Sequence, residues 1–370
     1  MKIPVFEPEI TAEDRAAVQH ALERGEISGS GGKSLEDFEQ KFAEYCGFAY
    51  GVATTSGTTA LHLASHAAGF GPGDEVLVST CTNIGTILGA HHLGATTVAV
   101  DSEAKTWNLD LDHLESLITP QTKGVIPVHF LGHPVDMDRL MKIADRHGLI
   151  VIEDAAEAHG AKIRGRVVGS HGHMACFSFY ANKIITTGEG GMVVTNDKNL
   201  VEKLRLLRNL GFTQPRFSHE VAAYNFRMTA YQAALGGSQL SRIEEILKSK
   251  RRMAACYREH LKGIDSIELP FEESWAEHVY WMFGIRVLPK GRINRNELAK
   301  ALRENGIDTR TFFRPMNEQP CFQKAKNFRP TSCPIGGDLW ETGILLPSSH
   351  TLTTEQVAQI TTVIRKTLVG

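Results

Sequence analysis

Short apolar runs recur along the first half of the chain, and amphipathic stretches separate many of them. The runs have the length and the β-branched content of buried strands. We expect strands at residues 75–79, 97–100, 124–128, 149–153, 175–179 and 192–195. Helices are predicted between several of them, including residues 56–68 and 137–147. Buried strands that alternate with helices predict an α/β fold, in which helices cover both faces of a mostly parallel sheet.

The pattern changes near residue 240, where a long and highly charged helical stretch begins. The remaining amphipathic stretches predict helices at residues 11–24, 34–46, 239–261, 295–305 and 354–368. One further strand is expected at residues 281–287. We therefore predict a large domain over residues 1–240 and a smaller C-terminal α+β domain over residues 241–370.

Composition narrows the class of protein. Of the 370 residues, 42% are hydrophobic and 22% are charged, and the formal net charge is −2. This balance argues against a nucleic-acid partner, because dedicated nucleic-acid binders carry a basic excess. A membrane span needs roughly 20 apolar residues, and no run approaches that length. The six cysteines are scattered and form no CxxC pair, which argues against a disulfide scaffold or a zinc ribbon. We expect a reduced, cytoplasmic protein.

A small-residue segment opens the predicted helix at residues 56–68. It reads Ser-Gly-Thr-Thr-Ala-Leu and follows a strand-like stretch at residues 50–53. The free amides and the dipole at a helix N-terminus attract anions such as phosphate. A capped helix start without a ligand has the same sequence signature. The segment alone leaves both interpretations open.

Two charged residues stand at positions where α/β proteins bind ligands. Asp154 follows the apolar strand predicted at residues 149–153, and ligands bind at the carboxyl ends of parallel strands. Lys183 lies between an aromatic strand and a glycine-rich turn, where a desolvated amine could act as a nucleophile. An Asp that caps the next helix and an ordinary loop lysine are the alternatives.

The order of these features predicts a cofactor. Lys183 follows Asp154 by 29 residues, and the helix start precedes both. Pyridoxal 5′-phosphate needs donors for its phosphate, a carboxylate for its ring nitrogen and an amine for its aldehyde. Two histidine pairs, His91–His92 and His171 with His173, have no Cys or carboxylate partner at ligand spacing. No metal site is predicted.

Five segments together carry a family resemblance that runs almost from end to end. They are SGTTALHLA, GPGDEVLV, IEDAAEAHGA, FSFYANKIITTGEGGMV and YNFRMTAYQAALGGSQL. The chain resembles the DegT/DnrJ/StrS family of pyridoxal-phosphate-dependent sugar aminotransferases, which have the fold-type I architecture. This resemblance implies a large domain with a mostly parallel mixed sheet flanked by helices.

The resemblance also implies residue roles. Lys183 would bind the cofactor covalently and then carry a proton to the substrate carbon, while Asp154 would pair with the pyridine nitrogen. Glu157 would lie near the 3-oxygen of the cofactor. Asn225 would reach the phosphate of the neighbouring subunit's cofactor, which makes a homodimer the expected active form. Three residues would bind the phosphate of the same subunit's cofactor: Gly57, Thr58 and Ser178.

The implied reaction has two half-reactions. Glutamate would first convert the cofactor to pyridoxamine 5′-phosphate, which would then aminate a nucleotide-linked keto sugar of the GDP-4-keto-6-deoxymannose type. A UDP- or dTDP-linked sugar, or one without a nucleotide, stays open as an alternative. A pyridoxamine-dependent dehydratase is disfavoured by Lys183, because that branch of the family carries His there. A non-catalytic homologue is disfavoured by the intact Asp154 and Lys183.

The chain departs from the family pattern where cofactor and substrate are expected. Asn83 stands where the family usually has an aromatic residue that stacks on the cofactor ring. Arg314 would add a cation for a substrate carboxylate or diphosphate, although an exposed loop arginine explains it equally well. The positions that the resemblance assigns to the substrate are Glu26, Ser28, Arg314 and Asn317.

Overall fold

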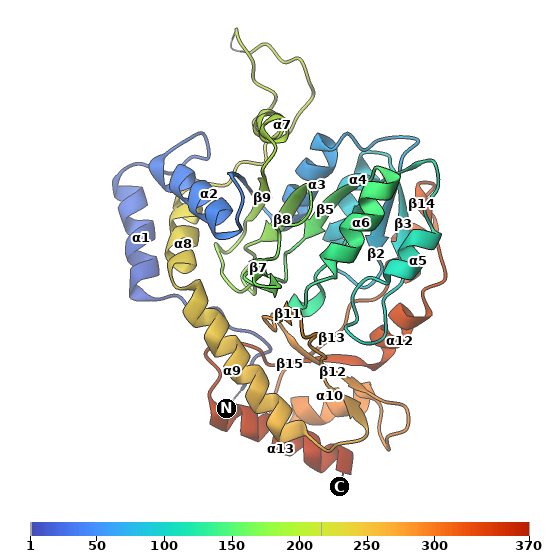
Figure 1. Cartoon of the computed structure of the whole chain (residues 1–370). Helices are drawn as coiled ribbons and strands as arrows, with labels where there is room; N and C mark the ends of the chain where they lie inside the picture. Colours follow the sequence, from blue (N-terminus) through green and yellow to red (C-terminus); the bar gives the residue numbers. More distant parts are fainter. Residues whose placement is uncertain (1, 216, 370) are drawn as a thin grey trace.

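An eight-stranded mixed sheet occupies the centre of the computed structural model, which describes residues 2–215 and 217–369 (Figure 1). In spatial order its strands are β1 (Tyr50–Thr54), β9 (Gly191–Thr195), β8 (Met174–Ser178), β5 (Ile150–Asp154), β4 (Thr122–Ile126), β2 (Glu75–Ser79), β3 (Thr96–Val100) and β14 (Phe328–Arg329). β9 runs antiparallel to β1 and β8, and the other neighbours are parallel. The predicted α/β fold is confirmed.

Side chains of the central strands alternate between two buried clusters, because successive residues of a strand point to opposite faces. On β2, Leu77 joins one cluster, while Val76 and Val78 join the other. The Leu77 face is covered by α2 (Lys33–Tyr45), α5 (Leu111–Ser116) and α6 (Met137–His147). The opposite face is covered by α3 (Gly57–Ala67), α4 (Gly85–His92) and α7 (Lys198–Arg208). The sheet is therefore buried on both sides.

A second, antiparallel sheet lies below the first in Figure 1. Its strands are β10 (Ile267–Glu268), β12 (Phe283–Val287), β15 (Gly343–Leu346) and β13 (Arg310–Thr311). Three helices pack with it in a third buried cluster: α9 (Ile243–Leu261), α10 (Arg295–Glu304) and α13 (Thr354–Val369). The remaining elements are α1 (Ala12–Glu23), α8 (Ala230–Ser241), α11 (Pro320–Gln323), α12 (Pro334–Thr342), the 3-10 turns η1 (Phe130–Gly132) and η2 (Met316–Glu318), and a small sheet of β11 (Ala276–Glu277), β6 (Lys162–Ile163) and β7 (Arg166–Val167).

The single helix predicted at residues 239–261 is wrong at its N-terminal end. The structure has two helices there, α8 and α9, and Arg242 between them leaves the helical region with φ −116° and ψ 16°. The guanidinium of Arg242 pairs with Glu9 and, at 2.9 Å, with the buried carboxylate of Asp14. These contacts are tertiary, so the helical pattern of the sequence does not reveal the break.

The division into domains at residue 240 stays a prediction, because contacts cross it in both directions. Ile3 belongs to the buried cluster of the small sheet and forms a bridge to Ile307. In the other direction, β14 adds a parallel strand to the edge of the large sheet. Over residues 2–215 and 217–369, no helix has the length and apolarity to cross a membrane. The same residues contain no group of three or more His, Cys, Asp or Glu side chains arranged to hold a metal ion.

Candidate active site

A cavity of about 380 Å³ lies where several strands of the large sheet end. Its lining includes the last residues of β5 and β8 and the segment that follows β2, together with the start of α3. The structure thus gathers side chains that are far apart in the sequence at the carboxyl edge of a parallel sheet, the usual ligand-binding edge of such folds. Seven predicted cofactor-binding residues line it: Gly57, Thr58, Asn83, Asp154, Glu157, Ser178 and Lys183.

One wall of the cavity is the N-terminus of α3. Ser56 caps this helix: its hydroxyl accepts from the amide of Thr59 at 3.1 Å, and the Thr59 hydroxyl accepts from the Ser56 amide at 2.9 Å. The amides of Gly57 and Thr58 lie in the first turn, where a helix has no internal acceptors for its N–H groups. A Cβ on Gly57 would stand 2.7 Å from the Cβ of Ser178, so only glycine lets the helix start approach β8 this closely. The wall suits a phosphate.

Asp154 contributes a buried carboxylate to the opposite wall. Its Oδ2 accepts a 2.7 Å hydrogen bond from the hydroxyl of Thr86, and its Oδ1 accepts from the amide of Ala156 at 3.1 Å. Burial raises the pKa of Asp154, while these donors and the nearby Lys183 oppose the rise. A cationic partner inside the cavity would complete the stabilisation of the ionised form.

The neighbouring carboxylate of Glu153 has a different role, because alternation along β5 directs it to the other face. It accepts hydrogen bonds from the amides of Gly169 (2.9 Å), His171 (2.9 Å) and Gly172 (2.6 Å). It also lies 3.0 Å from Nε2 of His129. Glu153 therefore fixes the turn before β8, and Asp154 is left for the cavity.

Lys183 is a half-buried lysine that lines the cavity. Burial lowers the pKa of Lys183, and the carboxylates of Glu157 and Asp154 oppose that effect. Its Nζ lies 3.9 Å from the centre of the Trp281 ring. Among the described residues Lys183 takes part in no ion pair within 4.0 Å. A desolvated amine without a salt bridge is available for covalent chemistry.

Sequence comparison identifies the kind of protein that has this cavity. A family model described as the DegT/DnrJ/EryC1/StrS aminotransferase family matches residues 8–365. The chain belongs to this family. It is 43% identical to a GDP-perosamine synthase of Caulobacter vibrioides over 321 residues, which are 86% of each chain. It is 40% identical to a UDP-N-acetyl-3-dehydro-alpha-D-glucosamine 3-aminotransferase of Acidithiobacillus ferrooxidans over 346 residues, which are 93% of this chain and 90% of that protein.

A solved structure of the same kind agrees over nearly the whole chain. DesV from S. venezuelae, in complex with a ketimine intermediate, matches with a TM-score of 0.92 at 37% identity, covering 99% of this chain and 98% of that chain. The predicted family and fold are therefore confirmed, and the protein is an aminotransferase of the DegT/DnrJ/EryC1/StrS family.

The cavity of this aminotransferase fits pyridoxal phosphate. The turn of free amides at Gly57 and Thr58 suits the phosphate, and the close approach of α3 to Ser178 shapes it. Asp154 offers a buried carboxylate for the ring nitrogen, and Lys183 offers an amine without an ion pair. Glu157, whose Oε2 accepts from the Leu131 amide at 2.8 Å, completes the acidic side. Burial raises the pKa of Glu157 to about 7.

Several residues of the cavity escaped the sequence analysis, among them Thr86, Trp281 and Phe313. Thr86 donates to Asp154 and in turn lies 2.6 Å from the hydroxyl of Thr82. Trp281 comes from the segment before β12, and its Nε1 donates to the carbonyl of Asn182 at 2.7 Å. Phe313 follows β13. Only tertiary contacts bring these three to the cavity, although an aromatic pair such as Tyr280–Trp281 was a visible sign of burial.

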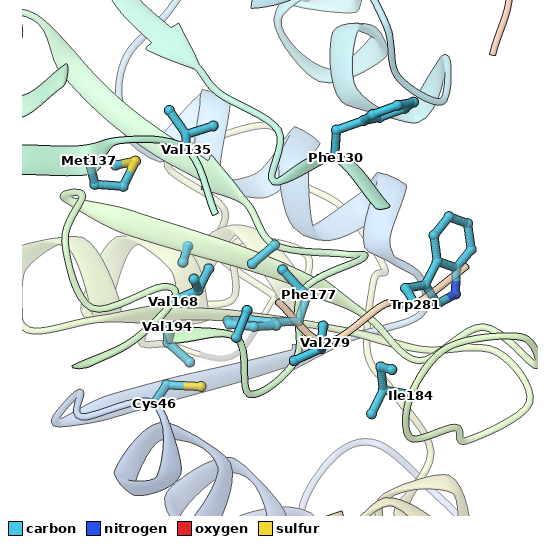
Figure 2. Packing of buried hydrophobic residues seen from close by; sticks show 14 of the residues in the cluster. Cys46, Phe130, Val135, Met137, Val168, Phe177, Ile184, Val194, Val279 and Trp281 are labelled. Atoms are coloured by element: carbon cyan, nitrogen blue, oxygen red, sulfur yellow. The ribbon is translucent and has the colours of Figure 1, made fainter. Parts of the chain in front are cut away.

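Figure 2 shows the buried residues that pack near Trp281. The segment that carries Val279 packs beside Phe177, and Trp281 lies at the edge of the same buried cluster. The indole is 4% exposed, which fixes its plane against Lys183. Trp281, which lies 41 positions beyond the predicted domain boundary at residue 240, therefore forms part of the active-site cavity.

The other predicted residues do not line the cavity of this chain. Asn225 is exposed and forms a bridge to Asn209. Glu26 pairs with Arg24 at 3.1 Å, and hydrogen bonds from Arg24 and Ser34 lower the pKa of Glu26 to about 2. The remaining contacts are Ser28 to Ser30 (3.1 Å), Arg314 to Glu318 (3.8 Å) and Asn317 to the hydroxyl of Thr80 (2.9 Å). The substrate roles of Glu26, Ser28, Arg314 and Asn317 stay predictions.

Asn83 does line the cavity, but its side chain bonds to the backbone of its own segment. Its Oδ1 accepts from the amide of Gly85 at 2.9 Å and so shapes the entry to α4. A Cβ on Gly85 would come within 2.8 Å of the Thr58 hydroxyl, so this turn is held against the start of α3. The aromatic rings that line the cavity come instead from Tyr180, Trp281 and Phe313.

Proposed function

We propose that this aminotransferase uses pyridoxal phosphate to transfer an amino group from glutamate to the keto carbon of a GDP-linked 4-keto-6-deoxymannose. The observation that carries the cofactor is the pair of Asp154 and Lys183, which line a cavity that begins at the N-terminus of α3. The sugar rests on the resemblance to the GDP-perosamine synthase of Caulobacter vibrioides.

The cofactor, when bound, supplies an electron-withdrawing ring that stabilises charge at the carbon losing or gaining a proton. Gly57, Thr58 and Ser178 hold its phosphate through amide and hydroxyl donors. Asp154 keeps the ring nitrogen protonated by offering its ionised carboxylate. Thr86 and the Ala156 amide orient that carboxylate through their hydrogen bonds.

Lys183 is the group that moves protons. Once its Nζ is free, it removes a proton from the amino donor and later returns one to the sugar carbon. Burial favours the neutral, basic form of this amine, and the indole of Trp281 holds it inside the cavity. Glu157 lies close enough to Lys183 for each charge to influence the other's pKa, so it supports the protonated state between the two transfers.

A homodimer completes the proposal. Asn225 is exposed in the single chain, as a residue that serves a partner's cofactor must be. Large apolar side chains are also exposed near the cavity: Tyr180, which lines it, is 48% exposed, and Ile84, next to Asn83, is 37% exposed. A second subunit would cover them. The six free cysteines suit the reducing cytoplasm, where we expect the enzyme to work.

The test is an assay with purified protein, pyridoxal phosphate, glutamate and a panel of GDP-, UDP- and dTDP-linked 4-keto sugars. We expect an amino sugar, detected by mass spectrometry, from the GDP-linked substrate and none from the Lys183→Ala variant. Alanine and aspartate in place of glutamate test the donor. An active Lys183→Ala variant, or no product with any sugar, would contradict the proposal.

A UDP-linked 3-keto sugar is the second candidate substrate. It is favoured by the 40% identity to the aminotransferase of Acidithiobacillus ferrooxidans. Adding that sugar class to the panel decides between the two, because the amino group would appear at carbon 3 instead of carbon 4.

A further inference from the structure

A second cavity, of about 230 Å³, lies in the C-terminal part of the chain between α10 and the edge strand β13. It shares no lining residue with the active-site cavity. α10 presents one face to it, and Ile344 of β15 also lines it. Four of its nine lining residues are cationic and none is acidic: Arg295, Lys300, Arg303 and Arg310.

Arg295 is the decisive member of this group. It is 94% buried, because its residual exposure is only 6%, and it lines the cavity. Its Nε is buried without a hydrogen-bond partner, and its Nη1 reaches the carbonyl of Gly343 only at 3.4 Å, which is long for a hydrogen bond. Its Cζ lies over the ring of Trp340, 5.4 Å from the ring centre.

A buried guanidinium normally faces a carboxylate, because an unpaired buried charge is costly. Arg295 has no ion pair within 4.0 Å among the described residues. Burial lowers the pKa of Arg295, and the distant charge of Glu341 offsets only part of that effect. An anion bound from solution would therefore stabilise the charge of Arg295, because the described residues provide no ion pair for it.

The other cations leave room for such an anion. Arg310 pairs with Asp308 at 2.8 Å, and Lys300 lies 4.0 Å from Glu304 on the exposed side of α10. Arg303 takes part in no ion pair within the described part of the chain. Thr309 and Thr311 add hydroxyl groups to the lining.

We propose that the groove between α10 and β13 is a binding site for a phosphate group, either inorganic phosphate or the terminal phosphoryl group of a phosphate monoester. Arginine suits this chemistry because its planar fork donates two hydrogen bonds to one oxyanion. Arg295 provides the buried contact, while Arg303 and Lys300 close the site from the helix. The proposal does not rest on the proposed aminotransferase substrate.

The test uses the holoenzyme, in which the cofactor's own phosphate would occupy the anion site at the start of α3. Calorimetric titration with inorganic phosphate and with glycerol 3-phosphate, at constant ionic strength against chloride, gives the affinity. We expect the Arg303→Gln variant to bind phosphate about 10-fold more weakly, which corresponds to ~1.4 kcal/mol. Arg252→Gln, an exposed arginine of α9 outside the groove, is the matched control and should bind like the unchanged protein.

The two ligands distinguish inorganic phosphate from a phosphate monoester as the natural ligand, and the variants test whether the groove binds either one. Binding of both ligands assigns the site to a phosphoryl group, and binding of phosphate alone assigns it to the inorganic ion. Arg295→Gln should abolish binding; if that variant does not fold, Arg303→Gln still decides. Equal phosphate affinity in Arg303→Gln and Arg252→Gln, or no binding beyond chloride, would overturn the proposal.

Discussion

Trp281 contacts two lysines whose pKa values are both lowered, and the two lysines differ in what else surrounds them. Its indole ring covers the amine of Lys183 at 3.9 Å, while its carbonyl accepts a 2.9 Å hydrogen bond from Lys250 of α9. Lys250 also donates to the carbonyl of Ser348. Burial lowers the pKa of both amines, and it lowers the pKa of Lys250 to about 7.

The difference between the two lysines shows what burial alone does not provide. Lys183 faces a cavity and has the carboxylates of Asp154 and Glu157 nearby. Lys250 has carbonyl partners from two segments, and it does not line the active-site cavity. A depressed pKa therefore makes a lysine a catalytic candidate only where space for a ligand accompanies it; Lys250 instead ties α9 to β12 and to the end of β15.

The largest expected effect separates the two lysines by activity. Lys183→Arg keeps a positive charge but loses a transferable proton near neutral pH. We expect turnover to fall by about 10²–10⁴-fold, which is the range that general acid–base catalysis contributes. Steady-state kinetics with glutamate and the keto sugar measures it. Turnover in Lys183→Arg within tenfold of the unchanged enzyme would contradict the assigned role.

The next largest effect is expected when the carboxylate of Asp154 is neutralised. Lys183 has this carboxylate nearby, whereas the partners of Lys250 are carbonyl groups. Asp154→Asn keeps the shape and the hydrogen bond from Thr86 but cannot stabilise a protonated ring nitrogen. We expect turnover to fall by about 10²–10³-fold, as for other preorganised electrostatic groups. Cofactor content, measured by absorbance after denaturation, should stay within about a factor of two because the phosphate contacts remain. Full turnover with normal cofactor content would exclude this role for Asp154.

A third experiment examines Lys250 through stability. In the folded protein this amine titrates near pH 7, whereas an unfolded lysine titrates near 10.4, so the unfolded state binds more protons between these values. Stability contributed by this group therefore rises with pH across that window, by up to about 3 kcal/mol from pH 7 to 9.5.

Urea unfolding at the two pH values measures the rise. Lys250→Met should remove it, while Lys248→Met, an exposed lysine on the same helix, should keep it. An identical pH dependence in both variants would show that Lys250 stays protonated, held by its two carbonyl partners.

The smallest expected effect concerns the residue that the lysines share. Trp281→Leu removes the ring face from Lys183 but leaves the backbone carbonyl for Lys250. A cation–π contact contributes about 0.5–2 kcal/mol, so the pKa of Lys183 should fall by about 0.4–1.5 units. Trp281→Phe keeps an aromatic ring, so the pKa of Lys183 in this variant should lie between its values in the unchanged protein and in Trp281→Leu. The pH dependence of Lys183 acetylation in cofactor-free protein, read by mass spectrometry, gives this pKa; a higher value in Trp281→Leu would be inconsistent with the contact.

Part of the active site was predictable from the sequence because its signals are local. The helix start at Ser56–Thr58, the carboxylate that ends β5 and the lysine before a glycine-rich turn each follow from their own neighbours in the chain. All three line the cavity. Trp281 and Phe313 carry no such signal, because their place depends on how the small sheet packs against the large one.

The sequence by itself determined the alternation of strands and helices, the order of the cofactor motifs and the family. These depend on periodicity and on short spacings, which the chain carries regardless of its folding partners. Only the tertiary structure decided which of two adjacent carboxylates, Glu153 or Asp154, meets the cavity, where α8 breaks from α9, and that Arg295 is buried without an anion. Each of these depends on which groups lie opposite a side chain once distant segments pack together, and no local pattern records that.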